Sequence, residues 1–306
     1  MIRLALIGYG KIAQDQHIPN IAAHTSLELV AIVSTSASGP ENLPVYRTLD
    51  ALLTSEKLDA VVIATPALPR AALARRALEA GCHVFLETPP AVTLGDVDIL
   101  AALAQKNKRT LFTSWHAQAN PAVQEAAQHL QAEGLAEMNI QWQEDVEQWH
   151  PGQQWIWQAG GFGVMDAGIN ALSIASKLCT QPICVETCRF MMHKAGVQPI
   201  RASLIARSGV GPITGLFDWT FKGKPQWCIE AKSQAGNDII LDQGGARLFY
   251  NGELQPQHHD PLAEYRALYT SFLDHIAQGT SYIDADPLRI VADMWLMADH
   301  LNPQAL

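Results

Sequence analysis

The sequence contains no uninterrupted apolar run of about 18 residues, the length that crosses a membrane, and no low-complexity tract. No charged segment followed by an apolar one opens the chain, so we expect a protein that is neither membrane-spanning nor secreted. Basic side chains are also scarce: 21 Lys and Arg stand against 30 Asp and Glu, and the formal net charge is −9. Because no basic cluster offsets this charge, we expect neither a nucleic-acid nor a membrane partner.

Cysteine pairs at CxxC spacing are also absent. The chain has five cysteines, an odd set that predicts reduced thiols and a cytoplasmic protein. Two of them, Cys184 and Cys188, are close in sequence, but no second Cys or His pair lies at ligand spacing, so we predict no metal site. The others are Cys82, Cys179 and Cys228.

The most informative stretch opens the chain. An apolar run of strand length ends on Gly8-Tyr9-Gly10, and Lys11-Ile12-Ala13 then opens a segment that reads as helical. In a dinucleotide-binding turn, Gly8 would allow the tight bend and Gly10 would let the backbone approach a pyrophosphate. Ala13 would let the helix pack close to the strand. The alternative is an ordinary strand-to-helix turn.

Alternation of strands and helices continues to about residue 118 and predicts a parallel, doubly wound sheet of the Rossmann type. Ligands of such sheets bind beyond the carboxyl ends of the strands. The expected strands are 29–33, 59–64, 83–86 and 110–114, and the expected helices are 69–80 and 93–105, the second capped by Thr93. The segments that follow the strands are Ser34–Ser36, Thr65–Pro69, Glu87–Pro90 and Ser114–Ala117.

Beyond residue 118 the pattern changes to alternating segments typical of antiparallel strands. We therefore expect a dinucleotide-binding domain over 1–118 and a substrate-binding α+β domain over 119–306, whose last helices are free to pack back on the first domain. The expected strands are 138–148, 185–192, 202–208, 213–221, 226–232, 238–241 and 246–250, with helices at 121–131, 164–178 and from about 260 onward.

Two groups of residues in this second part are suited to chemistry. Asp166 and Asn170 lie four residues apart on the expected helix, so they share a face and could hold a hydroxyl group; the alternative for Asp166 is a helix cap. Trp149, Trp155 and Trp157 suit an apolar floor for a sugar or a nicotinamide ring, or else fill the core. Two further candidates for the pocket are Trp227 and His116, the latter just after a strand end.

These motifs resemble the Gfo/Idh/MocA oxidoreductases, and within them the bacterial aldose 1-dehydrogenases. The resemblance covers essentially the whole chain. It is carried by the opening glycine turn, by Glu87-x-Pro89-Pro90, by Gly163-x-x-Asp166-x-Gly168-x-Asn170, by Trp115-His116, by Glu144-Asp145-Val146, and by the run from Trp149-His150-Pro151-Gly152 to Trp157.

The resemblance implies NAD(P)-dependent oxidation of the C1 hydroxyl of L-arabinose or D-galactose to the lactone. By this resemblance, Asp166 and Asn170 would hold and polarise the C1 hydroxyl. The sugar pocket would be lined by His116, Glu144, Trp149 and Trp227, and the cofactor would be bound by Gly8, Gly10, Lys11, Ile12, Ser34, Thr35, Thr65, Glu87 and Trp157. It also suggests a homodimer formed through the sheet of the second domain.

One departure from the family pattern concerns catalysis. The family has a catalytic lysine in a Glu-Lys-Pro motif where this chain has Thr88. The threonine hydroxyl is not a general base near neutral pH, but as a residue of the catalytic site it can position a hydroxyl group or a water. Three explanations stay open: an engineered replacement, Asp166 acting as the base, or a non-catalytic protein that binds sugar and cofactor. Another reaction of the same fold, such as dehydrogenation of a cyclitol or reduction of a keto sugar, is a further alternative.

The choice between NAD and NADP is also open from the sequence. An acidic residue after the second strand would hold the ribose 2′-hydroxyl of NAD, and an arginine would hold the 2′-phosphate of NADP. Ser34-Thr35-Ser36 offers neither. We expect both cofactors to bind, with a lean to NAD unless a distant cation contributes.

Overall fold

The computed structural model describes residues 1–36, 39–194, 196–256 and 260–301. The chain forms two compact units: unit 1 combines Met1–His116 with Asp260–Ala285, and unit 2 combines Ala117–His259 with Asp286–Leu306. Unit 1 therefore takes helix α8 (Ala263–Gln278) from far along the sequence, and α8 packs beside α1 (Ile18–Ala23). Within the described ranges, no helix has both the length and the apolar character needed to cross a membrane.

Unit 1 is built on a six-stranded parallel sheet with the order β3-β2-β1-β4-β5-β6. All four residues of β4 are buried, as expected for a strand covered on both faces. This confirms the predicted doubly wound parallel sheet. The strands are β1 (Ile2–Ile7), β2 (Leu27–Val33), β3 (Val45–Tyr46), β4 (Ala60–Ile63), β5 (His83–Leu86) and β6 (Leu111–Thr113).

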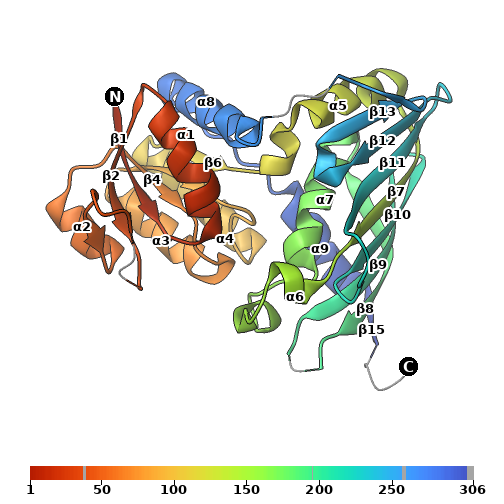
Figure 1. The fold of residues 1–306 in the computed structure, drawn as a ribbon, viewed down its shortest axis with the longest axis horizontal. Coiled ribbons are helices and arrows are strands. Elements are labelled where there is room, and N and C mark those ends of the chain that lie inside the picture. The colour runs from red at the N-terminus through yellow and green to blue at the C-terminus, as the bar shows by residue number, and fades with distance from the viewer. Residues whose placement is uncertain (37–38, 195, 257–259, 302–306) are drawn as a thin grey trace. The chain divides into compact units, whose positions relative to one another are not determined.

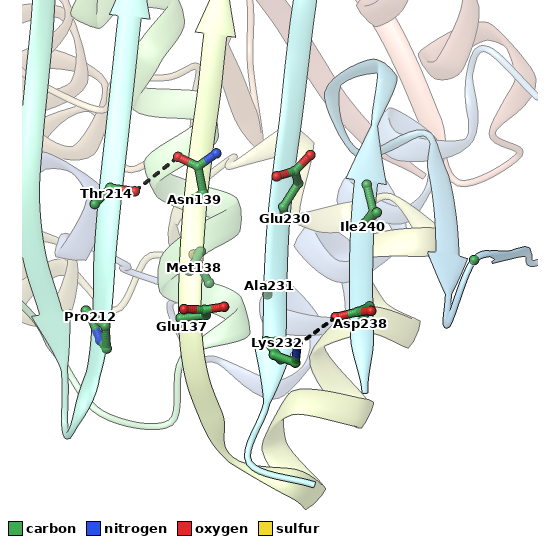
Figure 2. A pocket seen from close by; sticks show the side chains of 11 residues that line it. Glu137, Met138, Asn139, Pro212, Thr214, Glu230, Ala231, Lys232, Asp238 and Ile240 are labelled. Atoms are coloured by element: carbon green, nitrogen blue, oxygen red, sulfur yellow. Dashed lines mark hydrogen bonds and ion pairs between the residues drawn. The ribbon is translucent and has the colours of Figure 1, made fainter. Parts of the chain in front are cut away.

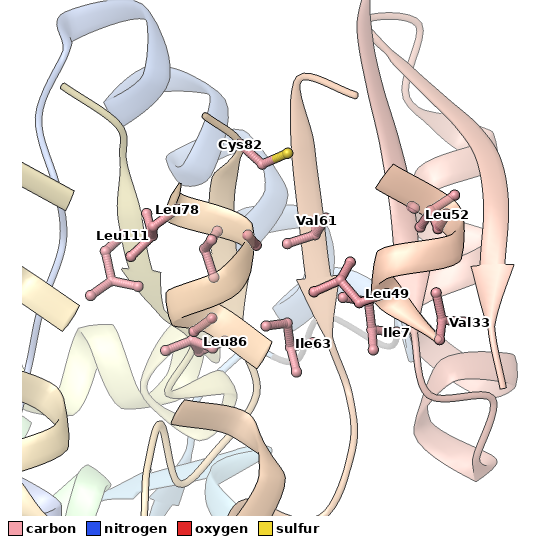
Figure 3. Close-up of a cluster of buried hydrophobic side chains, with 14 of the residues drawn as sticks. Ile7, Val33, Leu49, Leu52, Val61, Ile63, Leu78, Cys82, Leu86 and Leu111 are labelled. Carbon is pink, nitrogen blue, oxygen red and sulfur yellow. The ribbon is translucent and has the colours of Figure 1, made fainter. Parts of the chain in front are cut away.

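A continuous apolar core fixes the strands of unit 1 beneath their carboxyl ends. Ile7, Val61 and Ile63 of the central strands pack with Leu49 of α2 and Leu78 of α3 (Figure 3). Each such side chain contributes roughly 1.5–3 kcal/mol on burial, which stabilises the packing of the helices on the sheet. The helices are α2 (Leu49–Ser55), α3 (Ala67–Glu79) and α4 (Leu94–Asn107), preceded by the π-helical turn η1 (Ala13–His17) that leads into α1.

Two elements of unit 1 escape prediction from the sequence: β3 and α2. A strand of 2 residues has no periodicity to read, and α2 has only 7 residues. The predicted cap of α4 is present, since Thr93 Oγ1 accepts a hydrogen bond from the Asp96 backbone N–H at 3.1 Å.

Unit 2 contains a nine-stranded sheet with the order β14-β13-β12-β11-β7-β10-β9-β8-β15. The β7–β10 and β8–β15 pairs are parallel and the others are antiparallel, which confirms the predicted, mainly antiparallel sheet. The strands are β7 (Leu135–Gln143), β8 (Ile183–Met192), β9 (Pro199–Ser208), β10 (Gly211–Asp218), β11 (Gln226–Ser233), β12 (Asp238–Asp242), β13 (Arg247–Tyr250), β14 (Glu253–Leu254) and β15 (Ala298–Leu301).

Helices cover one face of this sheet and leave the other open (Figure 1). Along β9 buried and exposed residues alternate, so only one face of the strand contributes to the core. The helices are α5 (Pro121–Glu133), α6 (Val146–Trp149), α7 (Met165–Leu178) and α9 (Asp286–Met297), and the 3₁₀ turns are η2 (His116–Ala119), η3 (Gln154–Trp157) and η4 (Gln243–Gly245).

Two predictions for unit 2 are wrong in detail. The strand expected over 138–148 ends at Gln143, because Asp145 caps the short helix α6 by accepting a hydrogen bond from the Glu147 N–H at 3.0 Å. The helical C-terminal segment is followed by β15, which pairs with β8 in parallel.

Candidate functional site

A cavity of about 760 Å³ lies at the carboxyl ends of β1, β2 and β4 in unit 1. Five of the nine predicted cofactor residues line it, namely Gly8, Gly10, Ser34, Thr35 and Thr65. This is the edge at which a doubly wound sheet binds its ligand. Lys11 and Ile12 are exposed and lie outside the lining; Lys11 Nζ forms an ion pair with Asp15.

The two glycines of the opening turn meet different demands. Gly8 has φ +100°, and a Cβ there would lie 2.7 Å from the Ala64 carbonyl oxygen, so no other residue fits. A Cβ on Gly10 would meet no atom within 4 Å. The space over Gly10 therefore fits a group that approaches the backbone closely, such as the pyrophosphate of a dinucleotide. The residues present suit NAD(P) at this cavity.

Glu87 and Thr88 follow β5, and the Glu87 carboxylate organises this strand end. Glu87 Oε2 accepts a hydrogen bond from the Thr88 N–H at 3.0 Å. Glu87 Oε1 accepts one from the Tyr265 hydroxyl at 2.7 Å and lies 2.9 Å from His17 Nε2. The His17 ring also contacts the Tyr269 hydroxyl, 2.7 Å from Nδ1. Glu87 thus ties Thr88 to α8, an arrangement that no local sequence pattern reveals.

Burial alone would raise the pKa of Glu87, but the hydrogen bond to His17 and the positive field of neighbouring groups outweigh it and lower the pKa to about 2. The carboxylate is therefore ionised at neutral pH although Glu87 is only 4% exposed. Because its oxygens are occupied by protein donors, its direct effect is on the position of Thr88.

Arg70, a residue that the sequence analysis missed, holds the same strand end from the other side. Its guanidinium donates hydrogen bonds to the Thr65 carbonyl at 2.8 Å, to the Glu87 carbonyl at 2.8 Å and to the Pro89 carbonyl. Arg70 is buried in α3. The backbone on both sides of Thr88 is thereby fixed.

His116 follows β6 and belongs to unit 1. Its Nδ1 lies 2.9 Å from Glu264 Oε2, and its ring stacks on Tyr265 with centroids 5.8 Å apart. Burial lowers the pKa of His116, but the hydrogen bond and charge of Glu264 more than compensate and raise it. His116 is thus anchored to the α8 segment, and its role at a sugar stays a prediction.

In unit 2, Asp166 and Asn170 lie on α7 one turn apart. The N-cap of α7 is Val164, so Asp166 is not the cap but a residue of the first turn. Asn170 Oδ1 is buried and, within the described ranges, has no hydrogen-bond partner. A buried acceptor without a donor costs about 1–3 kcal/mol, and a ligand hydroxyl that donates to it would remove that cost.

The glycines before α7 serve packing. A Cβ on Gly161 would lie 2.2 Å from the Trp155 carbonyl oxygen, and one on Gly163 would lie 2.3 Å from the Pro199 carbonyl oxygen. Both residues are buried. They bring the backbone close enough to set the start of α7.

Glu144 lies just after β7, with its carboxylate between two indoles. Trp219 Nε1–H donates to Oε1 at 2.8 Å, and Trp227 Nε1–H donates to Oε2 at 2.7 Å. Burial raises the pKa of Glu144, the indole hydrogen bonds oppose the rise, and the charge of Asp166 adds to it. Glu144 therefore fixes the Trp227 ring. Trp219 is a site residue that the sequence analysis missed.

The tryptophans of the long motif divide between surface and interior. Trp149 is 44% exposed and meets the Trp227 ring edge-on, with centroids 5.2 Å apart. Trp157 is buried, stacks on His193 at 3.9 Å and meets Trp219 edge-on at 5.6 Å. Trp149 and Trp227 thus form an accessible aromatic corner, and the assignment of Trp157 to the cofactor stays a prediction.

A second hollow, of about 570 Å³, lies on the open face of the unit 2 sheet. Figure 2 shows Asn139 and Thr214 on neighbouring strands, joined by a hydrogen bond of 3.0 Å, and Lys232 paired with Asp238 at 3.7 Å. Within the described part of the chain, none of the predicted sugar or cofactor residues lines this hollow.

Comparison with known proteins agrees with these features. The family described as "Oxidoreductase family, NAD-binding Rossmann fold" (GFO_IDH_MocA) matches residues 2–114. Galactose 1-dehydrogenase of Pseudomonas fluorescens is 37% identical over 99% of this chain and 98% of its own length.

Solved structures show the same relationship. D-galactose-1-dehydrogenase from Rhizobium etli has a TM-score of 0.91 and 40% identity, and the match covers 98% of this chain and 96% of that one. A 3-ketoreductase from Actinomadura kijaniata, solved with NADP, shares the fold at 18% identity with a TM-score of 0.84, over 98% of this chain and 99% of that one. The chain therefore belongs to the Gfo/Idh/MocA oxidoreductase family, and its N-terminal part is an NAD-binding Rossmann domain.

Proposed function

We propose that the protein is an NAD(P)-dependent aldose 1-dehydrogenase that oxidises the C1 hydroxyl of D-galactose, and of L-arabinose, to the corresponding lactone. The near full-length relatives that act on galactose support the substrate class. L-arabinose lacks only the hydroxymethyl group of D-galactose, and one small group discriminates weakly unless it clashes or leaves a polar group unpaired.

The observation that carries the proposal is the buried Asn170 Oδ1, one turn from Asp166 on α7, which has no hydrogen-bond partner among the residues that the structure describes. The single proton of a pyranose C1 hydroxyl would go to Asp166, and the same hydroxyl oxygen could accept from the Asn170 amide N–H while a neighbouring sugar hydroxyl donates to Oδ1. NAD(P)⁺, when bound at the glycine turn, supplies the acceptor for the hydride that leaves C1. The O1–H proton would go to Asp166 as the C1=O bond of the lactone forms, and the C1–H electron pair would leave as the hydride that bound NAD(P)⁺ would accept.

The aromatic corner supports a sugar on the same unit. Trp149 and Trp227 offer apolar ring faces to the C–H side of a pyranose, and Glu144 holds the Trp227 ring by its indole N–H. Glu144 has lone pairs left beyond those two bonds and could accept from a sugar hydroxyl.

The threonine at position 88 decides which residue is the general base in this proposal. Its hydroxyl cannot accept a proton near neutral pH, and Glu87 beside it is already bound by protein donors. Asp166 is then the base. The second candidate function, a protein that binds sugar and cofactor without turnover, is favoured by the same observation of threonine at this position.

Self-association is a separate part of the proposal. The open face of the unit 2 sheet is long and mixed in charge, and we propose that a second copy of the chain covers it. Sedimentation of the protein at increasing concentration tests this, with a charge reversal at Lys232 as the perturbation and one at Lys108, on unit 1, as the control.

A panel of aldoses with NAD⁺ and NADP⁺, followed by the absorbance of the reduced nicotinamide, tests the function. Turnover with D-galactose or L-arabinose is the expected result. Calorimetric titration with the same sugars separates the second candidate, for which saturable binding occurs without any reduction of the cofactor. Turnover of a cyclitol alone contradicts both.

A further inference from the structure

The carboxyl ends of β2 and β3 lie side by side at the dinucleotide cavity. Val33 of β2 pairs in parallel with Tyr46 of β3, and the Ser34 N–H donates to the Tyr46 carbonyl at 2.9 Å. Ser34 and Arg47, the residues that follow these two, therefore leave the sheet at the same edge. Both line the cavity.

Arg47 places a cation where the sequence of β2 supplies none. One of its guanidinium N–H groups donates to the Thr35 carbonyl, which holds the side chain over the loop after β2. Within the described ranges this is the only side-chain hydrogen bond of Arg47, and a guanidinium has five donors, so most of them are left for a ligand. The Ser34 and Ser36 hydroxyls, 3.0 Å apart, line the same cavity.

The other charged groups that line the cavity balance each other. Arg76 of α3 donates to Asp50 Oδ1 at 2.6 Å. This ion pair leaves the positive charge of Arg47 uncompensated among the described lining residues. An exposed arginine with free donors beside hydroxyl groups suits a phosphate monoester, and no acidic residue in Ser34–Ser36 stands in its way.

We propose that Arg47 binds the 2′-phosphate of NADP(H) and makes this protein prefer NADP(H) to NAD(H). The ribose that carries this phosphate lies beyond the carboxyl end of the second strand in the doubly wound fold, where Arg47 is tethered. NADP(H) would then be the cofactor of the proposed dehydrogenase. Its use in turnover rests on the proposed function, whereas its binding at Arg47 does not. Arg47 would be the distant cation on which the lean to NAD depends.

The test is a set of calorimetric titrations without sugar, using 2′,5′-ADP, 5′-AMP, NADP⁺ and NAD⁺. Wild type is expected to bind 2′,5′-ADP and NADP⁺ more tightly than their partners without the 2′-phosphate. Arg47→Ala is expected to weaken both by about 10- to 100-fold, the range for a charge-assisted hydrogen bond, and to leave 5′-AMP and NAD⁺ within about 2-fold. Arg47→Lys retains part of the affinity.

Arg75→Ala is the matched control, because Arg75 is exposed on α3 and does not line the cavity. Equal binding of NAD⁺ and NADP⁺ by wild type, or equal weakening of both in Arg47→Ala, overturns the proposal. Since no sugar is present, failure here is distinguishable from failure of the dehydrogenase function. Galactose turnover with NAD⁺ alone contradicts the Arg47 assignment and leaves that function intact.

Discussion

The indole N–H of Trp227 donates a hydrogen bond of 2.7 Å to Glu144 Oε2, and this bond couples a buried carboxylate to an aromatic wall. The other carboxylate oxygen is held by Trp219. These two hydrogen bonds explain why a glutamate lies in an apolar corner, because the carboxylate orients the Trp227 ring.

Replacing Glu144 by alanine should therefore loosen this corner. The buried indole N–H of Trp219 loses its acceptor, which costs about 1–3 kcal/mol where water cannot replace it, and the half-buried Trp227 loses its own at a smaller cost. We expect a lower unfolding temperature and a KM for galactose raised about 10-fold or more, with a smaller effect on kcat. Trp149→Phe, which keeps an aromatic ring at the corner, should change KM much less; a loss of kcat alone in Glu144→Ala would contradict an orienting role.

The absence of a lysine beside Glu87 has a direct test. Because Asp166 is the base in the proposed reaction, Thr88→Lys should change kcat little. Thr88→Ser, which keeps the hydroxyl, serves as the control and should change little. A rise of about 10²–10⁴-fold in the lysine variant would show that a missing base is the main defect of this chain and would contradict the assignment of Asp166.

Substitutions of Asp166 and Asn170 on α7 distinguish a general base from a residue that positions the sugar. Asp166→Asn should lower kcat by about 10²–10⁴-fold, because it removes the proton acceptor and keeps the shape. Asn170→Ala should raise stability slightly, since a buried, unpartnered oxygen disappears, yet weaken galactose binding. Unfolding curves and sugar titrations measure these effects, and a destabilised Asn170→Ala would show that the amide is structural.

The two glycines of the opening turn should behave differently. Gly8→Ala meets the Ala64 carbonyl at 2.7 Å with φ +100°, so it should destabilise unit 1 by a few kcal/mol. Gly10→Ala meets no atom within 4 Å and should leave the unfolding temperature unchanged while weakening cofactor binding. If Gly10→Ala bound NAD(P) like wild type, the pyrophosphate would lie elsewhere.

Glu87 predicts how stability depends on pH. Its pKa is about 2 in the folded protein against an ordinary 4.5, so its contribution is complete above pH 4.5 and is lost as pH falls toward about 2, where the folded carboxylate takes up its proton. The shift corresponds to a contribution on the order of 3 kcal/mol. Comparison of wild type with Glu87→Gln in urea should show a stability difference that shrinks below pH 4.5. A difference that is constant with pH would contradict the ionised state.

Much of the fold follows from local pattern. The parallel strands of unit 1 are short, mostly apolar and followed by polar turns, and β4 and β5 appear where the sequence predicts them. The turn at Gly8 could be predicted from the sequence, because its backbone conformation requires glycine. The end of β7 could not, since its exit depends on the cap of α6 by Asp145.

The long-range parts of the site were out of reach of the sequence. Arg70, Tyr265 and Trp219 meet the motif residues only through the tertiary fold, at separations of 17, 178 and 75 residues. Arg47 belongs to the same class, because a strand of two residues carries it to the cavity. The resemblance to a known family identifies residues that would contact the sugar and the cofactor. It does not identify the residues that hold those side chains in position.

The most direct measurement of the central claim uses D-galactose that carries deuterium at C1. Incubated with the protein and NADP⁺, this substrate should deliver its deuterium to C4 of the nicotinamide, with a slower rate than the protium form, and yield galactonolactone. Binding of the labelled sugar and cofactor without any transfer of deuterium would contradict the account.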